Sequence, residues 1–524
     1  MTAPKISTSL NRADELETLI DAVKALIVPF VRDADEAAPS KTDGGASVAN
    51  SSWNSLVEPC EPLDLVSRLA FELPEREGGG REGLLQVIQQ ILRFSVNTWD
   101  QGFLDKLYSS TNAVGVVSEL LLSVLNTNVH VYQVSPALTV IEKTTARTLA
   151  GLFGFDGPRA GGVTIGGGSA SNLTAVVIAR NTLFPSTKTG GNGSHRFALF
   201  TSEHGHYSIE KAASACGIGS PPRRAASGRP AFGPCPSNVA GRMLPSALRD
   251  AVLTAREEGM TTLFVNATAG TTVLGSFDPF EDVAAVCREL GLWMHIDASW
   301  GGSAIFSARH RHRLAGTHLA NSVTVNPHKM LNVPVTCSFL LGPDMDIFHR
   351  ANTLPASYLF HGDCAATSGE QDKAEVWDLA DLTLQCGRRG DSLKLALSWI
   401  YYGASGLERQ IDSAFAMAAH LAGLVEVHPD FTLVSANPPP CLQVCFYYTP
   451  GGGAKGSAAA TGPAENSRRT REMVAKLMRR GFMIDYAPGE HGSFFRVVVN
   501  CQTLQGTVEG LMRALESVGK EVVL

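Results

Sequence analysis

The sequence lacks the features that mark membrane proteins, secreted proteins and nucleic-acid-binding proteins. It contains no run of about 20 consecutive apolar residues, so no membrane-spanning helix is expected. The first residues, Met1-Thr-Ala-Pro-Lys-Ile, contain no apolar core of the kind found in secretion signals. The formal net charge is −6, which disfavours nucleic acid and anionic membrane surfaces as main partners. We therefore expect a cytoplasmic protein that acts on a small molecule.

The ten cysteines form no Cys-x-x-Cys pair and show no metal-like spacing. Scattered cysteines in a chain this long are typical of reduced, buried thiols in a cytosolic protein, and we predict no metal site. The chain has 524 residues, of which 44% are hydrophobic and 18% are charged. This length and composition are typical of a globular enzyme with two or three domains.

The pattern of apolar residues predicts an α/β protein in three parts. Residues 1–124 carry mainly helical patterning, with a Ser/Gly/Ala/Asp-rich linker expected at 33–52, and this segment is expected to take part in forming a dimer. Residues 125–395 alternate between helix-like and strand-like runs, which predicts a large domain with a doubly wound, mostly parallel sheet. Residues 396–524 have the pattern of a smaller α+β domain.

An acid and a lysine stand at the ends of two predicted buried strands. The run Leu292-Trp-Met-His-Ile-Asp-Ala-Ser299 ends near Asp297, and Ser322-Val-Thr-Val-Asn-Pro-His-Lys-Met330 ends near Lys329. The two residues are about 30 positions apart, the length that a strand, a crossover and a parallel strand need. Both are therefore expected at the sheet edge where open α/β folds bind ligands. A lysine that can form a Schiff base, facing an acid that can pair with a pyridine nitrogen, is the core of a pyridoxal phosphate site.

Three further stretches at predicted strand ends offer the remaining contacts. Gly162-Val-Thr-Ile-Gly-Gly-Gly-Ser-Ala-Ser-Asn172 precedes a helix predicted to start near Leu173, and glycines before a helix N-terminus suit a phosphate. Thr201-Ser-Glu-His-Gly-His-Tyr-Ser208 carries two histidines without a zinc-like partner, which favours stacking on a planar ring over metal binding. Asn266-Ala-Thr-Ala-Gly-Thr-Thr272 adds hydroxyl groups. Each stretch taken alone is also common as an ordinary turn.

Together these motifs resemble the pyridoxal phosphate-dependent group II decarboxylases, in particular their glutamate and cysteine sulfinate decarboxylase branch. The resemblance covers roughly three quarters of the chain, from about Asn126 onwards. The stretches that carry it are Asn126-Thr-Asn, Thr201-Ser-Glu-His-Gly-His, Ala267-Thr-Ala-Gly-Thr-Thr, Trp293-Met-His-Ile-Asp-Ala-Ser-Trp-Gly-Gly, Asn321-Ser-Val-Thr-Val-Asn-Pro-His-Lys-Met, Ala356-Ser-Tyr-Leu-Phe, Leu384-Gln-Cys-Gly-Arg-Arg and Phe494-Phe-Arg.

The resemblance implies a fold-type I enzyme that works as a homodimer with a shared active site. It assigns Lys329 as the Schiff-base lysine, Asp297 as the partner of the pyridine nitrogen, and His206 as the residue that stacks on the ring. His328 is expected to contact cofactor or substrate, and Arg496 to bind a substrate carboxylate, for which a bidentate guanidinium is suited. The contacts implied on the phosphate side are Ala170, Ser171, Thr268 and Asn326.

The sequence departs from the family pattern at several positions near the expected site. Ser299 replaces an alanine that packs on the ring, Lys106 replaces a substrate-side glutamine, and His130 replaces an aromatic residue. The last two changes add potential positive charge near the substrate. The relatives also carry a tyrosine in a mobile loop that returns a proton to Cα, whereas this chain has no tyrosine between Tyr358 and Tyr401.

These observations favour a decarboxylase of a small acidic L-amino acid, with aspartate, giving β-alanine, preferred over glutamate and cysteine sulfinate. Because the loop tyrosine is missing, His361, His328 or a residue of the partner chain must supply the proton, or the reaction ends differently. An aldehyde-forming oxidative decarboxylase is therefore the main alternative. An aminotransferase and a non-catalytic dimeric scaffold are the others, and the intact set of Lys329, Asp297, His206 and Arg496 disfavours the scaffold.

Overall fold

Two sheets organise the part of the chain that the computed structural model describes, which is residues 10–45, 56–69, 71–219, 232–354, 375–451 and 462–522. The larger sheet has seven strands in the order β1-β7-β6-β5-β4-β2-β3, and only β7 runs antiparallel to its neighbours. The predicted mostly parallel sheet is therefore confirmed. Its strands are β1 (Gly161–Ile165), β2 (Phe197–Ser202), β3 (Phe232–Cys235), β4 (Thr261–Thr268), β5 (Trp293–Ala298), β6 (Ser322–Val325) and β7 (Ser338–Gly342).

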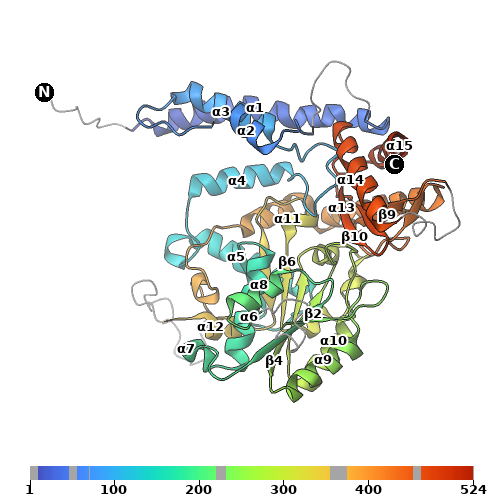
Figure 1. Ribbon diagram of the computed structural model, residues 1–524. Helices are drawn as coiled ribbons and strands as arrows, with labels where there is room; N and C mark the ends of the chain where they lie inside the picture. The colour runs from blue at the N-terminus through green and yellow to red at the C-terminus, as the bar shows by residue number, and fades with distance from the viewer. Residues whose placement is uncertain are drawn as a thin grey trace.

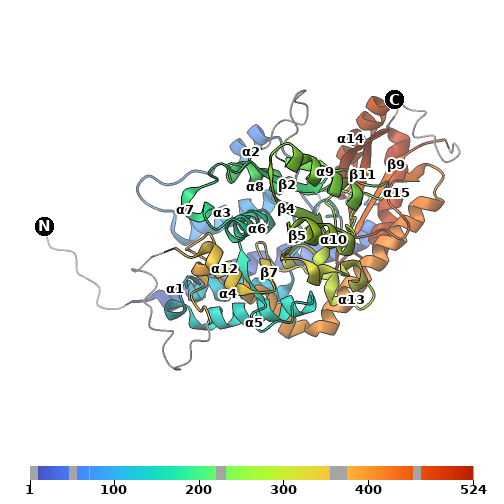
Figure 2. The same cartoon turned by 90° about the horizontal axis from the view of Figure 1, so that it is seen from below.

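The smaller sheet lies to one side, among the C-terminal helices (Figure 1, Figure 2). Its four antiparallel strands have the order β10-β11-β9-β8. They are β8 (Phe431–Leu433), β9 (Gln443–Tyr448), β10 (Asp485–Gly489) and β11 (Gly492–Val498).

Several helix ends follow local sequence signals. For example, α10 ends at Gly291, which adopts the left-handed conformation (φ 65°) that glycine tolerates at a helix C-terminus. The α-helices are α1 (Arg12–Thr42), α2 (Pro62–Leu69), α3 (Gly80–Phe94), α4 (Ala113–Leu125), α5 (Pro136–Leu152), α6 (Gly168–Leu183), α7 (Thr187–Gly190), α8 (Ser208–Ala215), α9 (Pro245–Glu257), α10 (Phe280–Leu290), α11 (Pro327–Met330), α12 (Met345–Asn352), α13 (Ser392–Val427), α14 (Pro463–Arg479) and α15 (Gln505–Glu521).

Both faces of the large sheet are covered because its strands are apolar at successive positions. Side chains alternate between the two faces of a strand. Phe339 and Leu341 of β7 pack in a core shared with α5, α9 and α10, whereas Leu340 packs in a second core with α6, α8 and α12. The sheet therefore lies between two helical layers, as predicted for a doubly wound fold.

The linker predicted for residues 33–52 is wrong over its first ten positions, because α1 continues to Thr42 through Pro29 and Pro39. The alanines and glutamate of this stretch favour helix, and tertiary contacts hold its end in place. Lys41 is buried, and its Nζ lies 2.9 Å from Asp100 Oδ1 and donates to the carbonyl of Gly481 at 2.8 Å. Residues 46–55 lie outside the described part.

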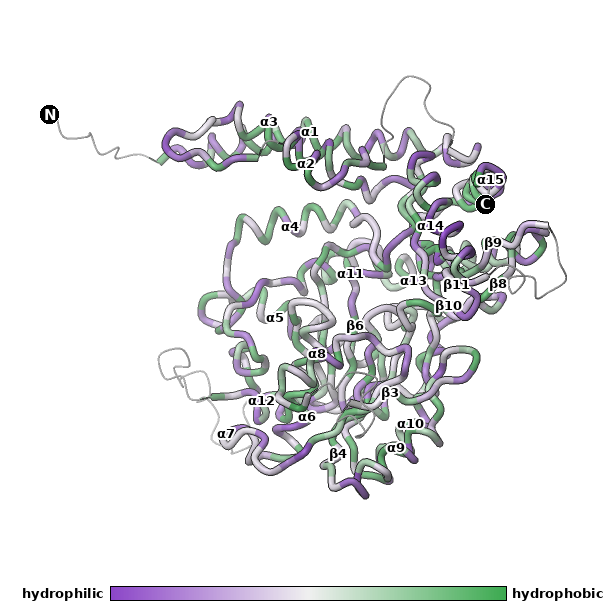
Figure 3. The backbone as a smooth tube through the Cα atoms, viewed as in Figure 1, coloured by the Kyte–Doolittle hydropathy of each residue, from purple (hydrophilic) through white to green (hydrophobic). Residues whose placement is uncertain are grey.

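The helix α4 exposes an apolar side, and Figure 3 shows it as a mostly hydrophobic stretch between the N-terminal helices and the body of the molecule. Its inward side carries Gly115, Ser118 and Leu122. Among the described helices, α4 included, none combines the length and apolar character that crossing a bilayer requires. The outward residues, each at least 41% exposed, are Val116, Val117, Leu120, Leu121, Val124 and Leu125.

Candidate active site

A cavity of about 270 Å³ opens at the carboxyl ends of the central strands of the large sheet. The register of β4, β5 and β6 places Thr268, Asp297 and Thr324 side by side, and the chain after β6 enters α11 with Lys329 in its short turn. This is the sheet edge at which the sequence predicts the site. The predicted residues that line the cavity are Lys329, Asp297, His206, His328, Thr268, Ser299 and Asn326.

Asp297 is buried at the end of β5 and is held by two hydrogen-bond donors. The Asn172 side-chain amide donates to Oδ2 at 2.9 Å, and the Ser299 backbone N–H donates to Oδ1 at 3.1 Å. Burial alone would raise the pKa of Asp297, but the charge of Lys329 and these hydrogen bonds together lower it. The cavity therefore presents an ionised carboxylate, as a protonated ring nitrogen requires.

Asn172, for which the sequence alone predicts no role, connects Asp297 to a buried hydrogen-bond network. Its amide nitrogen also donates to Ser208 Oγ at 2.9 Å, and its Oδ1 lies 3.0 Å from His295 Nε2. His295 Nδ1 in turn lies 2.8 Å from Ser322 Oγ, and burial lowers the pKa of His295 to about 4. A neutral His295 that donates from Nε2 fixes the Asn172 amide, and the amide fixes Asp297. The signal was a polar residue at the end of the glycine-rich motif.

Burial lowers the pKa values of both Lys329 and His328. Burial lowers the pKa of Lys329, although Asp297 partly offsets this, and a larger share of neutral amine favours nucleophilic attack. Burial also lowers the pKa of His328 to about 4, so its imidazole is neutral at pH 7. His328 Nδ1 lies 3.0 Å from the backbone nitrogen and 2.7 Å from the carbonyl oxygen of Cys337, which fixes the ring orientation.

The polar groups of the cavity fit a phosphorylated cofactor. Thr268 Oγ1 is buried without a hydrogen-bond partner in the protein and can donate to a phosphate, and Asn326 lines the cavity with an amide Nδ2 that can do the same. Gly168 begins α6, and a Cβ there would lie 2.6 Å from Ser299 Oγ and 2.8 Å from Asn326 Nδ2, so only glycine leaves this space open. The first N–H groups of α6 lack intrahelical acceptors and favour an anion. Because α6 begins earlier than the predicted Leu173, Ser169 lies in its first turn and lines the cavity.

Two predicted phosphate contacts lie beside this space rather than on its lining. The Ser171 hydroxyl is 2.9 Å from Ser338 Oγ and donates to the Gly167 carbonyl at 3.2 Å. Ala170 packs its side chain against the core around α6. Of the two residues, Ala170 is better placed to bind a phosphate, because its backbone N–H lies in the first turn of α6, where N–H groups lack intrahelical acceptors.

His206 lines the cavity next to Tyr207, with ring centroids 4.5 Å apart. Burial lowers the pKa of His206, which favours the uncharged ring that stacking on a pyridine would use. The backbone N–H of Ser208 donates to His206 Nδ1 at 3.2 Å and sets the ring orientation.

Arg496 and Lys106 meet at a shared carboxylate, that of Asp485. Arg496 Nη2 lies 2.6 Å from Asp485 Oδ2, and Lys106 Nζ lies 3.1 Å from the same oxygen. Arg496 also donates to the carbonyls of Thr272, a cavity residue, and Asp105, at 3.0 and 3.2 Å. Its Nε is buried without a partner. The predicted substrate arginine thus lies directly behind the cavity wall, and internal acceptors occupy most of its donors.

His130 lies elsewhere in the chain. Its Nδ1 is 3.0 Å from the Asn128 carbonyl, and its own carbonyl accepts from the Ala380 backbone N–H at 3.0 Å. Within the described part of one chain, no contact joins it to Lys106 or Arg496. The loop with Tyr358 and His361 lies outside the described residues.

The matches to known proteins agree with this geometry. Residues 62–449 match the family model described as the pyridoxal-dependent decarboxylase conserved domain. An L-aspartate decarboxylase of Metarhizium robertsii, dtxS4, is 58% identical over 516 residues, which are 98% of this chain and 99% of that protein. A glutamate decarboxylase-like protein of Gibberella zeae is 38% identical over 490 residues, 88% of this chain and 92% of its own. The crystal structure of mouse CSAD superimposes with a TM-score of 0.82 at 32% identity, covering 97% of this chain and 100% of that one.

Proposed function

The chain belongs to the pyridoxal-dependent decarboxylases, and within this family we propose that it removes the α-carboxylate of a small acidic L-amino acid, with L-aspartate preferred. The identity of 58% to a protein named L-aspartate decarboxylase, over nearly the full length of both chains, carries this proposal. We propose that Arg496, which lies behind Thr272 of the cavity wall, binds the second carboxylate; Asp485 and Asp105 balance the charges of Arg496 and Lys106 in the chain alone. Glutamate and cysteine sulfinate are the weaker candidates.

The residues of the cavity divide the work of decarboxylation. Bound pyridoxal phosphate supplies an electron sink for the pair of electrons left at Cα when CO2 departs. We assign Lys329 as the amine that binds the cofactor covalently and Asp297 as the carboxylate that keeps a proton on the ring nitrogen. Thr268 and Asn326 are proposed to bind the phosphate, with the N-terminus of α6. His206 and Ser299 are proposed to contact the two faces of the ring.

A proton must return to Cα after CO2 has left, and this chain lacks the tyrosine that its relatives use. Among the described residues, His328 is our candidate, because it lines the cavity and Cys337 holds its ring. Since its pKa is lowered to about 4, the ring would relay a proton taken up from water rather than store one. His361 and groups of a partner chain remain rivals. Without an efficient donor, the electron pair at Cα would be open to oxidation by O2, which would give an aldehyde, ammonia and hydrogen peroxide in place of the amine.

A competition experiment tests the substrate proposal. The purified enzyme, loaded with pyridoxal phosphate, is given equal concentrations of aspartate, glutamate and cysteine sulfinate, and amines, aldehydes, peroxide and CO2 are quantified together. We expect β-alanine to dominate, with one CO2 for each amine. Faster turnover of glutamate would overturn the choice of aspartate. Oxygen uptake with aldehyde and peroxide release would favour the oxidative reaction.

We expect Arg496→Gln to raise the KM for aspartate by about 10- to 100-fold, because hydrogen bonds to charged groups contribute about 1.5–3 kcal/mol. The kcat should change much less. The matched control is Arg469→Gln, since Arg469 is also buried in the C-terminal part of the chain and packs over Tyr448. It should lower the melting temperature and leave KM unchanged. An unchanged KM in Arg496→Gln would show that Arg496 only supports the fold through Asp485.

We further propose that two copies of the chain form a homodimer that shares its active sites. The exposed apolar side of α4 supports this, because a row of large aliphatic side chains on one helix is unfavourable in water. The N-terminal helices lie on the same side of the molecule as α4 (Figure 1) and are proposed to belong to the same interface.

The double variant Val117→Glu, Val124→Glu is expected to elute at half the mass of the wild-type protein, because it places two charges on the outward side of α4. Light scattering after size-exclusion chromatography measures this. The control is Val239→Glu, which changes a fully exposed valine in the loop between β3 and α9. A wild-type protein that is monomeric, or a double variant that stays dimeric, would contradict the proposal.

A cytoplasmic location also remains a proposal. It rests on the cysteines, since the nine in the described part of the chain are all free thiols and six of them are buried. A reducing compartment preserves such thiols.

A further inference from the structure

The loop that follows Lys329, residues 331–337, is hydrogen-bonded to the start of α4 and packs against its inward side. The Asn112 backbone N–H donates to the Asn332 carbonyl at 2.8 Å, just before α4 begins. One turn later, a Cβ at Gly115 would lie 2.6 Å from Pro334 Cδ, so helix and loop are in direct contact there. The loop is therefore held along its length by a helix outside the large sheet.

A cluster of four charges holds the far end of the loop; Lys394 and Asp391 are buried, whereas Glu119 and Arg389 are partly exposed. Lys394 is 0% exposed, and its Nζ lies 2.6 Å from Glu119 Oε1, 2.8 Å from Asp391 Oδ1 and 3.0 Å from the Thr336 carbonyl oxygen. Arg389 pairs with the other oxygen of Glu119. The ammonium thus donates to one carbonyl and forms ion pairs with two carboxylates, and the two cations of the cluster balance its two anions. Lys394 joins α4, α13 and the loop at one point.

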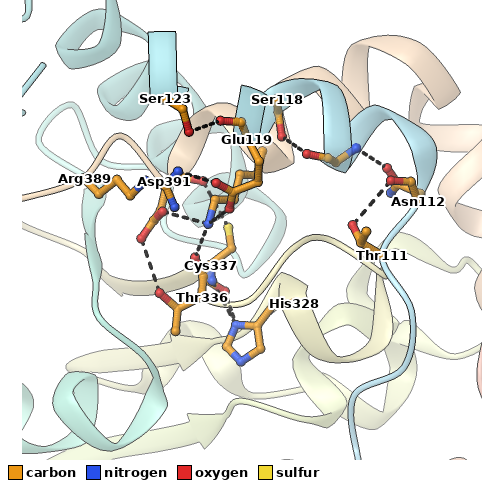
Figure 4. Close-up of polar contacts among 12 residues, drawn as sticks. Thr111, Asn112, Ser118, Glu119, Ser123, His328, Thr336, Cys337, Arg389 and Asp391 are labelled. Atoms are coloured by element: carbon orange, nitrogen blue, oxygen red, sulfur yellow. Dashed lines mark hydrogen bonds and ion pairs between the residues drawn. The ribbon is translucent and has the colours of Figure 1, made fainter. Parts of the chain in front are cut away.

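The cluster reaches the cofactor cavity through Cys337. The Cys337 thiol donates to the Asp391 carbonyl at 3.4 Å, and its backbone nitrogen and oxygen lie 3.0 and 2.7 Å from His328 Nδ1. Figure 4 shows Glu119 and Asp391 on one side of Thr336 and Cys337, and His328 on the other. The cluster therefore contacts the end of the loop, the end of the loop contacts His328, and His328 lines the cavity.

We propose that the four-charge cluster of Glu119, Arg389, Asp391 and Lys394 is a positioning device that fixes the His328 ring at the cofactor cavity. Packed apolar side chains would stabilise the position of the buried pair, Lys394 and Asp391, at least as well as ions do, so stability alone does not explain this pair. An ammonium held by two carboxylates specifies where the Thr336 carbonyl lies, and the backbone of the next residue, Cys337, contacts the His328 ring. The inference rests on the decarboxylase reaction but not on aspartate as substrate, so the competition experiment and the test below can fail separately.

The test is Lys394→Met, which keeps the length of the side chain and removes the ammonium. In the enzyme loaded with pyridoxal phosphate we expect Cys337 to react with N-ethylmaleimide at least ~10-fold faster than in the wild type, because the loop end opens locally. Cys441, which is equally buried, is the internal reference and should not change. The visible circular dichroism of the bound cofactor should fall by about half or more, because the ring loses a fixed neighbour.

Lys41→Met is the matched control. Lys41 is also a buried lysine that pairs with an aspartate and a backbone carbonyl, but it joins α1 to the C-terminal part of the chain. It should lower the melting temperature while the Cys337 rate, the circular dichroism and kcat stay at wild-type values. Changes in Lys394→Met no larger than those in Lys41→Met would overturn the proposal.

A double-mutant cycle tests whether Lys394 acts through His328. Lys394→Met should lower kcat by about 10- to 100-fold in the wild-type background but by less than about 3-fold in a His328→Asn background, because coupled residues are not additive. Fully additive effects would overturn the proposal. If Lys394→Met does not fold, Glu119→Gln replaces it in the same measurements of Cys337 reactivity, circular dichroism and kcat. This variant keeps the shape of the cluster and removes one charge.

Discussion

Lys329→Ala is expected to lower kcat/KM by at least ~1000-fold, because no other group can replace the amine that binds the cofactor. The variant should also lose the visible absorbance band of a pyridoxal group bound covalently to lysine. The cavity supports both expectations, since burial lowers the pKa of Lys329 and Asp297 lies opposite to it. Reduction of the wild-type enzyme with borohydride, followed by peptide mass spectrometry, should place the cofactor label on Lys329.

The control for this prediction is Lys188→Ala, which removes an exposed lysine that donates to the Arg350 carbonyl at the protein surface. It should retain full activity and the absorbance band. A borohydride label on a different lysine would contradict the assignment, and so would an active Lys329→Ala enzyme.

Asp297→Asn is expected to lower kcat by roughly 100- to 10000-fold, because an amide cannot keep a proton on the ring nitrogen and the ring becomes a weak electron sink. The fold should survive, since asparagine has the same shape. In the wild type, the Asn172 side chain and the Ser299 N–H donate to the two oxygens of Asp297. In the variant, the new NH2 group at position 297 replaces one of these acceptors, so one hydrogen bond is lost and the free energy of unfolding falls.

A cofactor analogue separates the two effects of Asp297→Asn. Pyridoxal phosphate methylated at the ring nitrogen carries a fixed positive charge and should restore part of kcat in the variant. Asp100→Asn is the matched control, because Asp100 is equally buried and pairs with Lys41 far from the cavity. Asp100→Asn should lower the melting temperature and leave kcat unchanged. If the analogue gives no recovery, Asp297 acts chiefly on structure.

The sequence predicts the centre of the site well because strand ends are a local property. The apolar runs before Asp297 and Lys329 are β5 and β6, and the parallel pairing of these strands brings both residues to one cavity. The same holds for Thr268 and Asn326, which follow from their places at strand ends. The pattern of apolar residues predicts where each strand ends, and this requires no information about contacts with distant segments.

Contacts between distant segments are what the sequence does not predict. Nothing local to Arg496 indicates that Asp485 and Lys106 meet it, because the pairing of β10 with β11 and the fold of the N-terminal segment bring these residues together. Lys394 looks like an ordinary helical lysine until α4 places Glu119 against it. The sequence also does not predict that α1 extends to Thr42, because a contact with Gly481, 440 positions away, holds the end of this helix.

That long connection of α1 has a consequence for how the protein is made. Lys41 and its acceptor, the Gly481 carbonyl, are 440 positions apart in the chain. A ribosome adding about 5–20 residues each second needs roughly 20–90 s to synthesise that span, and α1 lacks its C-terminal neighbours throughout this time. During this time its apolar positions are available to chaperones and to other nascent chains. Slow elongation or early truncation before β10 should therefore increase aggregation of newly made chains more than it affects the activity of those that are completed.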